Sequence, residues 1–194
     1  MKSNSKEKLY GSIAISNRHV HLTKETYEML FNEPLTMKKP ISQIGEFASN
    51  QTLIIKGPKG IIERVRVMGP HRDYNQVEVS RSDAYTLGIT PPVRESGDLE
   101  DSENITLVTE KNEITLENVC IQAERHVHMN EKMAEELGLK NDDLVKLIIN
   151  NDKGGEMEAF IKVKSNGFFE IHIDRDDANA FMLNNGDKVE IKKV

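Results

Sequence analysis

The tetrapeptide Arg-His-Val-His occurs twice in this chain of 194 residues, at Arg18–His21 and at Arg125–His128, and it uses four of the six histidines. Side chains two positions apart on a β-strand point to the same face, so the two imidazoles of each copy would lie side by side. Neutral imidazole is the commonest nitrogen ligand for zinc and related metals. A lone His-X-His step is a weak signal, but two copies with identical flanks predict a duplicated, metal-binding protein.

A second repeat supplies a third side chain to each histidine pair. Val77–Ala84 aligns with Ile171–Ala178, and Glu78 then falls opposite His172. Each of these two polar residues stands between β-branched residues on an expected strand, so it projects away from its apolar neighbours. The two sets of candidate ligands are His19, His21 and Glu78, and His126, His128 and His172. Three protein ligands with one open position are typical of catalytic zinc, whereas structural zinc usually has four and favours cysteine.

The elements that must position these side chains are mostly strands. A strand is expected before each His-X-His step and a short helix after it, with Thr23 and Asn130 as N-caps and Gly138 as the stop of the second helix. The other apolar, β-branched runs are expected strands over residues 52–56, 61–68, 76–80, 105–109, 113–116, 144–150, 157–164, 168–174 and 188–192. Many short strands separated by turn residues favour antiparallel barrels over a parallel sheet.

Composition excludes several classes of function. A formal charge of -6 argues against a nucleic-acid partner, because phosphate backbones require a basic face. No apolar run reaches the roughly 18–20 residues of a membrane helix, so we expect no membrane partner. The single cysteine, Cys120, excludes an internal disulfide, fits a reducing cytoplasm and is expected to be a buried structural thiol. Residues 1–10 are expected to form a flexible tail.

Arg72 is the candidate anion-binding residue. It follows the turn at Gly69-Pro70 and lies six residues before Glu78, at the end of a predicted hairpin. A guanidinium beside a metal is well shaped for bidentate contact with phosphate. The preceding residue, His71, belongs to neither repeat and is expected to be a solvated loop histidine.

Several separated segments in this order resemble the PduL-type phosphate acyltransferases, which are also called phosphate propanoyltransferases or phosphotransacylases. The resemblance covers about residues 13–187 of this chain. The segments that show it are Ser16–Leu22, Val67–Pro70, Gln76–Arg81, Pro92–Asp98, Arg125–Met129, His172–Asp174 and Ala178–Ala180.

This resemblance implies a fold and a reaction. The fold would be mostly β with capping helices, in two β-barrel domains related by internal duplication. One domain would be discontinuous, formed by residues 11–52 plus 124–194, and the second would be formed by residues 53–123. The reaction would convert acyl-CoA and inorganic phosphate reversibly into acyl phosphate and CoA. The sequence does not decide whether the short acyl group is propionyl or acetyl.

The resemblance also implies cofactors and site residues. Two zinc ions per chain would bind the two ligand sets found above, although other divalent metals also suit nitrogen and oxygen ligands. The zinc at His19, His21 and Glu78 would lie beside the CoA sulfur, and the other zinc with Arg72 would hold phosphate. No side-chain nucleophile is then needed. The implied CoA contacts are Ile15, Ser16, Lys59, Arg66 and Asn179.

This chain departs from the family pattern in two places. In Ser42–Phe47, Ile44 replaces a proline and Glu46 replaces a glutamine, which puts local substrate contacts in doubt. The short polar N-terminus also lacks the amphipathic helix that directs some members to bacterial microcompartments, so a cytoplasmic location is expected, with a microcompartment location as the alternative.

Two other functions remain open at this point. A dinuclear metallohydrolase or thioesterase would also use two metals, although such sites usually add bridging aspartates that neither repeat places. A non-enzymatic metal-binding module is the other alternative, and open three-ligand sites argue against it. A His-X-His amidohydrolase barrel is excluded by length, because that barrel needs about 250 residues. The oligomeric state is open, and a homo-oligomer is compatible with the sequence.

Overall fold

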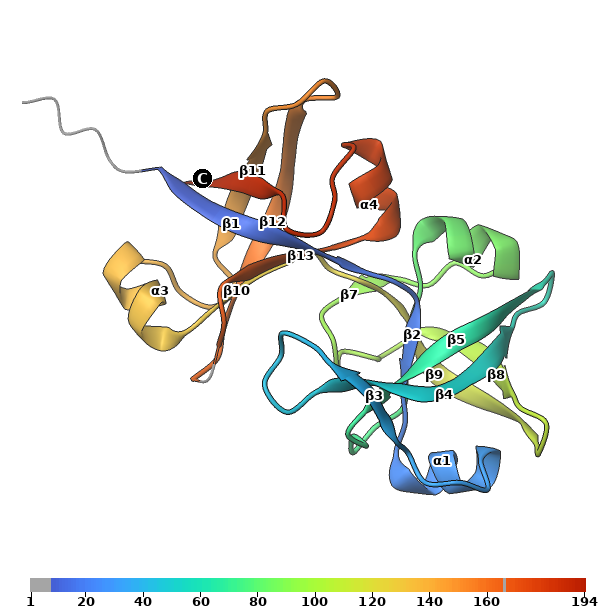
Figure 1. Cartoon of the computed structure of the whole chain (residues 1–194). Coiled ribbons are helices and arrows are strands. Elements are labelled where there is room, and N and C mark those ends of the chain that lie inside the picture. The colour runs from blue at the N-terminus through green and yellow to red at the C-terminus, as the bar shows by residue number, and fades with distance from the viewer. Residues whose placement is uncertain (1–7, 166) are drawn as a thin grey trace, which may run out of the picture. The chain divides into compact units, whose positions relative to one another are not determined.

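The computed structural model describes residues 8–165 and 167–194, in which strands dominate and the helices are short (Figure 1). The helices are α1 (Lys24–Leu30), α2 (Arg81–Leu87), α3 (Glu131–Leu137) and α4 (Arg175–Ala180). The strands are β1 (Leu9–Ser16), β2 (His19–His21), β3 (Met37–Pro40), β4 (Phe47–Lys56), β5 (Ile61–Gly69), β6 (Gln76–Glu78), β7 (Val93–Arg94), β8 (Glu103–Val108), β9 (Glu113–Ala123), β10 (His126–Met129), β11 (Leu144–Ile149), β12 (Gly155–Val163), β13 (Glu170–Asp174) and β14 (Lys188–Lys193).

The chain forms two compact units, each with its own apolar core. Unit 1 contains the residues up to Ser16 together with Arg125–Val194, and unit 2 contains Asn17–Glu124. The discontinuous domain was expected to keep residues 11–52, but residues 17–52 lie in unit 2. The reason is that β2 pairs with β5 and β6, and β4 pairs with β5 and β8. The chain returns to unit 1 at Arg125, one residue after the return predicted at residue 124.

Unit 1 is a closed six-stranded barrel in the order β1-β13-β10-β12-β11-β14. Alternate side chains point inward, as in β11, where Val145, Leu147 and Ile149 are buried. Four of its six strand pairs are antiparallel, as expected, whereas β1 runs parallel to β13 and β10 runs parallel to β12. The strands that bear candidate ligands, β10 and β13, are antiparallel neighbours.

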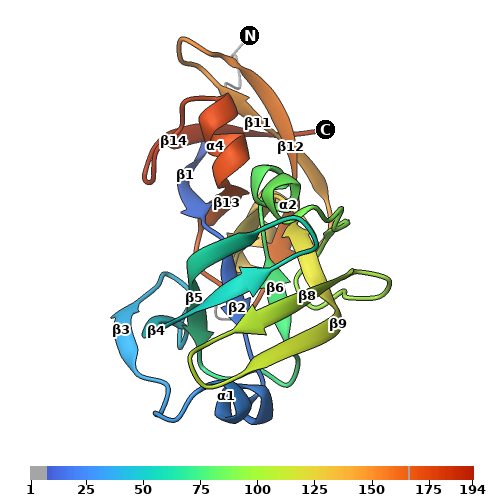
Figure 2. The same cartoon turned by 90° about the vertical axis from the view of Figure 1, so that its right-hand side faces the viewer.

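Unit 2 closes a ring of the same size through β4-β5-β2-β6-β9-β8, and β8 completes it by pairing with both β4 and β9 (Figure 2). The strands β3 and β7 lie outside this ring, on β4 and β9 respectively. Parallel pairs again occur beside the ligand strands, between β2 and β5 and between β6 and β9. The prediction of two barrels related by duplication is therefore confirmed.

The two repeats exchange their first strands. Along the chain β1 precedes β2, yet β1 pairs with β13 and β14 in unit 1. In the same way β9 precedes β10, yet β9 pairs with β6 and β8 in unit 2. In both barrels the exchanged strand runs parallel to the strand with the third candidate ligand. This exchange is the structural reason why unit 1 is discontinuous.

Side-chain caps define where the four helices of the described chain begin. The expected caps Thr23 and Asn130 accept from the backbone N–H groups of Thr26 and Met133. Gly138 ends α3 in the left-handed conformation, with φ of 61°, as expected. The helices α2 and α4 were not predicted, although their N-caps Ser80 and Asp174 are also typical capping residues. Among the described residues, no helix is long and apolar enough to cross a membrane.

The N-terminal tail is shorter than expected where the structure describes it. Residues 1–7 of the predicted tail lie outside the described residues. Leu9 and Tyr10 belong to β1, where they pair with Ile191 and Glu190 of β14. Lys8 adds an ion pair to Glu190 at 2.8 Å. The tail prediction is therefore wrong for Leu9 and Tyr10, because strand pairing extends to them.

Candidate metal centres and anion site

The first candidate centre lies on β2 and β6 of unit 2. These strands are antiparallel, with His19 opposite Glu78 and His21 opposite Gln76. The rings of His19 and His21 pack edge to face with their centroids 5.0 Å apart, and His19 Nε2 lies 3.4 Å from Glu78 Oε2. One ligand atom from each of the three side chains falls within 4.8 Å of the others. The structure thus brings this predicted set together.

The two histidines of this cluster are prepared to act as neutral ligands. His19 Nδ1 lies 2.8 Å from the carbonyl oxygen of Asn17, which can only accept, so Nδ1 carries a proton and Nε2 is the nitrogen available to a metal. His21 is 2% exposed, and its Nδ1 is buried without a hydrogen-bond partner among the described residues. Burial, followed by the neighbouring His19 and Arg72, lowers the pKa of His21 far below its usual range. An unpartnered buried nitrogen is costly unless a ligand satisfies it.

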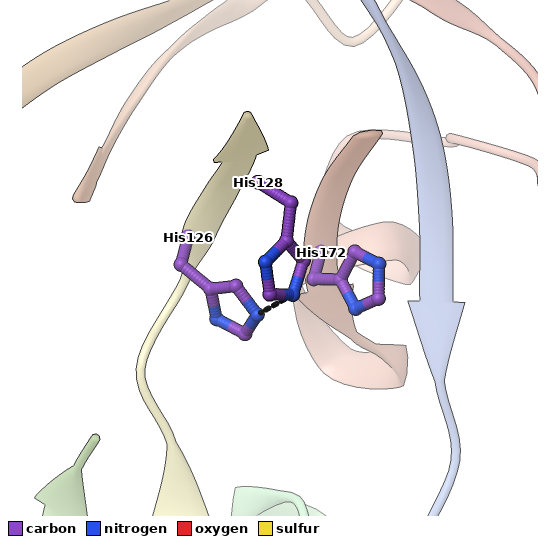
Figure 3. A group of neighbouring side chains, drawn as sticks. All are labelled: His126, His128 and His172. Atoms are coloured by element: carbon purple, nitrogen blue, oxygen red, sulfur yellow. Dashed lines mark hydrogen bonds between the residues drawn. The ribbon is translucent and has the colours of Figure 1, made fainter. Parts of the chain in front are cut away.

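The second candidate centre lies on β10 and β13 of unit 1 and repeats the same arrangement. His126 stands opposite His172, and His128 stands opposite Glu170. The Nε2 atoms of His126 and His128 are 3.1 Å apart, and the three rings gather at one place (Figure 3). Burial, then the nearby His126 and His172, lowers the pKa of His128 to about 2. At neutral pH the His128 ring is therefore neutral, as ligation requires.

Both clusters fit a zinc-type ion by their donor chemistry and spacing. Zinc bonds of about 2.0–2.1 Å in a tetrahedron separate neighbouring donor atoms by roughly 3.3 Å. The observed separations are 3.1 Å between the Nε2 atoms of His126 and His128, and 3.4 Å between His19 Nε2 and Glu78 Oε2. Each cluster offers three nitrogen or oxygen donors without a thiolate, which is the composition of open, catalytic sites.

Each third ligand candidate has a polar neighbour that the sequence analysis missed. Gln76 Nε2 donates to Glu78 Oε1 at 2.6 Å, while Gln76 Oε1 accepts from the backbone N–H of Gly97 at 2.7 Å. In unit 1, Glu170 Oε2 lies 3.1 Å from His172 Nε2. Gln76 precedes Glu78 by two positions, and Glu170 precedes His172 by two positions. Residues two apart on a strand share a face, so the aligned repeats already contained the signal that could have identified both neighbours. Such outer contacts fix the orientation of ligand side chains.

Arg72 lies in unit 2 and joins the network around Glu78. Its Nη1 donates to Tyr74 Oη and to Ser96 Oγ, at 3.1 Å each. Ser96 Oγ also accepts from Gln76 Nε2 at 2.9 Å. A continuous hydrogen-bonded path therefore runs from Arg72 through Ser96 and Gln76 to Glu78. The structure brings the predicted anion-binding residue into the surroundings of the first centre.

His71 differs from its expectation as a solvated loop residue. Its ring packs against the Tyr27 ring of α1, with centroids 4.9 Å apart. Its Nδ1 is buried and has no hydrogen-bond partner among the described residues. The sequence could not show this contact, because α1 and the loop after β5 are 40 residues or more apart along the chain.

Two of the predicted CoA contacts in unit 1, Ile15 and Ser16, lie on the strand that pairs with the strand of His172. Ile15 and Ser16 end β1 and pair with Ile173 and Asp174, immediately after His172. The Ile15 N–H is already bonded to a side-chain oxygen of Asn185. Asn179 is exposed on α4 of the same unit.

The predicted CoA contacts in unit 2 are not brought together. Arg66 lies opposite His19 in the parallel β2–β5 pair, and its Nη1 donates to the carbonyls of Ser49 and Asn50. Lys59 is exposed in the turn between β4 and β5. Five strand residues at about 3.3 Å each place that turn roughly 16 Å along β5 from Arg66. Arg66 is therefore close to the candidate centre, and Lys59 is not.

Comparison with known proteins gives one consistent family. The family described as phosphate propanoyltransferase matches residues 12–184. The chain is 45% identical over 183 residues to the phosphate propanoyltransferase of Thermotoga maritima, an alignment that covers 92% of this chain and 87% of that protein.

Two further relatives with the same name extend this comparison. The protein of Rhodopseudomonas palustris is 42% identical over 185 residues, covering 94% of this chain and 82% of the relative. The protein of Salmonella typhimurium is 42% identical over 171 residues, covering 87% and 81%. A match across nearly the whole sequence, on a fold with the expected pair of barrels, shows that this chain belongs to the phosphate propanoyltransferase family.

Proposed function

We propose that this protein is a phosphate acyltransferase that interconverts a short-chain acyl-CoA and inorganic phosphate with an acyl phosphate and CoA. Propionyl is the acyl group we favour, because the relatives are named phosphate propanoyltransferases, and acetyl is the alternative. The observation that best supports this function in the structure is the hydrogen-bonded path from Arg72 to Glu78, which links an anion-binding side chain to a metal-ligand cluster.

The proposed reaction is a direct transfer. A phosphate oxygen forms a bond to the thioester carbonyl carbon, the bond from that carbon to sulfur breaks, and the electron pair leaves with the CoA thiolate. Arg72 would bind the phosphate through charge-assisted hydrogen bonds and orient the attacking oxygen. The contacts of Arg72 Nη1 with Tyr74 and Ser96 would hold the guanidinium in place for this task.

We assign one divalent ion, zinc by preference, to each three-ligand cluster. The ligands would be His19, His21 and Glu78 in unit 2, and His126, His128 and His172 in unit 1. Such an ion, when bound, supplies positive charge for an oxygen anion or a leaving thiolate. The chain's own part is to present neutral imidazoles and to hold Glu78 through Gln76.

Burial of Cys120 argues against a covalent acyl-enzyme. Cys120 is the only cysteine, and it is 0% exposed in the core of unit 2. Burial, assisted by the charge of Glu103, raises the pKa of the Cys120 thiol to about 12. The reactive thiolate is thus disfavoured at neutral pH. A thiol nucleophile is therefore disfavoured, and the proposed reaction uses phosphate itself as the nucleophile.

CoA recognition is the least constrained part of the proposal. We keep Ile15, Ser16, Lys59, Arg66 and Asn179 as the proposed contacts. Arg66 has the strongest support, because it stands opposite His19 and is partly buried. Lys59, at the distant end of the β4–β5 hairpin, would at most meet a phosphate group of CoA.

The test is the release of free CoA from propionyl-CoA, with and without inorganic phosphate, combined with metal analysis of the purified protein. We expect phosphate-dependent release and about two divalent ions per chain. Release that does not depend on phosphate would make the protein a thioesterase. Metal binding without any release would make it a binding module, and either result would overturn the proposal.

A further inference from the structure

The guanidinium of Arg72 already has an anionic neighbour within the chain. Arg72 Nη2 lies 3.3 Å from Glu46 Oε1 and 3.4 Å from Glu46 Oε2. The other terminal nitrogen, Nη1, is bonded to the neutral oxygens of Tyr74 and Ser96. A carboxylate and a phosphate present the same kind of charged oxygen to a guanidinium. Glu46 therefore occupies the side of Arg72 on which an anion would be received.

The geometry of this ion pair is that of a weak, exchangeable contact. Both carboxylate oxygens share a single nitrogen, so the pair lacks the two parallel bonds of a fork-to-fork arrangement. Its distances exceed the roughly 2.7–2.9 Å of strong charge-assisted hydrogen bonds. The side chains of Arg72 and Glu46 are 20% and 23% exposed, so water reaches both partners.

A turn, not a strand, delivers Glu46 to this place. The backbone N–H of Glu46 donates to the carbonyl of Gln43, and Glu46 immediately precedes β4. Gly45 adopts a φ of 86°, a left-handed conformation that glycine accepts without strain. Displacing the carboxylate from Arg72 therefore requires no break in the hydrogen bonds between barrel strands.

We propose that Glu46 is a specificity-determining residue that competes with phosphate for Arg72, and so sets the phosphate concentration at which the enzyme works. This inference rests on the proposed function of Arg72 as the phosphate ligand. Phosphate binds only after Glu46 leaves the guanidinium, and acyl phosphate meets the same competition in the reverse direction. The Michaelis constants of both phosphate substrates are raised, and the constant for acyl-CoA is not.

The test replaces Glu46 by glutamine, which keeps the shape of the side chain and removes its charge. A partly exposed ion pair corresponds to a change in affinity of roughly two- to fivefold. Glu46→Gln should therefore lower the phosphate KM by about that ratio, at saturating propionyl-CoA, with little change in kcat. The matched control is Glu63→Gln, an equal loss of charge at an exposed position of β5, which should leave the phosphate KM unchanged.

A double variant isolates the competition from a general change in charge. In an Arg72→Ala background, Glu46→Gln should no longer alter the phosphate KM, because the shared guanidinium is gone. Calorimetric titration with inorganic phosphate should show the same tightening as the kinetics, without depending on turnover. If Glu46→Gln does not fold, Glu46→Asp retracts the charge by one methylene and should also lower the KM.

The outcomes separate this inference from the proposed function. An unchanged or higher phosphate KM in Glu46→Gln, or the same fall in both backgrounds, would overturn the role of Glu46 while the wild-type reaction stands. Absence of phosphate-dependent CoA release from the wild-type protein would overturn the function itself.

Discussion

The candidate centres of the two units share one backbone arrangement and differ in one ligand. In each, two histidines on a short strand face an antiparallel strand, and the first histidine stands directly opposite the third candidate ligand. That candidate is the carboxylate of Glu78 in unit 2 and the imidazole of His172 in unit 1. The duplicated pairing thus fixes the position of the candidate ligands, and substitution at a single position changes their charge.

This difference in charge favours a division of labour. A divalent ion held by three neutral imidazoles keeps its full charge, whereas a carboxylate ligand such as Glu78 cancels part of it. The supporting side chains differ in the opposite sense, since neutral Gln76 contacts Glu78 and acidic Glu170 contacts His172. The following predictions test what each candidate ligand and each supporting side chain contributes to its centre.

Removal of a histidine ligand should have the largest effect. His126→Ala deletes a donor of the unit 1 cluster and should reduce metal content from about two ions to one per chain. Activity should fall by more than the roughly 10–100-fold typical of losing an outer contact. Elemental analysis and CoA release measure both quantities, and His19→Ala is the matched change in unit 2. Full metal content in His126→Ala would contradict the ligand assignment.

Removal of the anion-binding side chain should affect one substrate only. Arg72→Ala deletes a charged hydrogen-bond donor, which is worth about 1.5–3 kcal/mol and corresponds to a rise in phosphate KM of roughly 10- to 100-fold. Metal content should stay at the wild-type value, because Arg72 lies outside both ligand sets. Steady-state kinetics with varied phosphate decide the point. An unchanged KM would place the phosphate site elsewhere.

Removal of a side chain that supports a candidate ligand should have a smaller effect, a loss of metal affinity confined to one unit. Gln76→Ala removes the donor that holds Glu78, so the metal affinity of the unit 2 centre should drop by about tenfold. Chelator competition in the His126→Ala background reports on that centre alone. Glu170→Ala in the same background is the control and should change nothing there. Equal losses in both variants would indicate general destabilisation.

The smallest effect concerns the pH dependence of stability in chelator-treated protein. The folded state lowers the pKa of both His21 and His128 below the usual 6.5. Below pH 6.5 the unfolded chain binds protons at these residues and the folded chain does not. The free energy of unfolding should therefore fall as the pH decreases from 6.5.

Thermal unfolding of the metal-free protein between pH 7.5 and 5 measures this effect, which should lower Tm by several degrees. The double variant His21→Gln/His128→Gln should show a weaker dependence on pH. A metal-free wild-type Tm that stays constant across this range would show that the two histidines are not kept neutral by the fold.

The sequence alone was sufficient for features that depend on local spacing. The His-X-His steps place two imidazoles on one face of a strand whatever that strand pairs with, and the aligned repeats select Glu78 and His172. Thr23 and Asn130 cap helices because each cap bonds to a residue three positions later. The candidate ligand sets and most strands were therefore predictable, and so was the burial of Cys120.

Only the tertiary structure decided which strands are neighbours. The exchange of β1 and β9, the chain crossing at Ser16 and the parallel pairs all depend on contacts between distant residues, which a period of two does not encode. The same holds for the approach of Glu46 to Arg72, which joins a turn and a loop 26 residues apart. Alternation determines the face of a strand on which a side chain lies, and the folded backbone alone determines what that side chain meets.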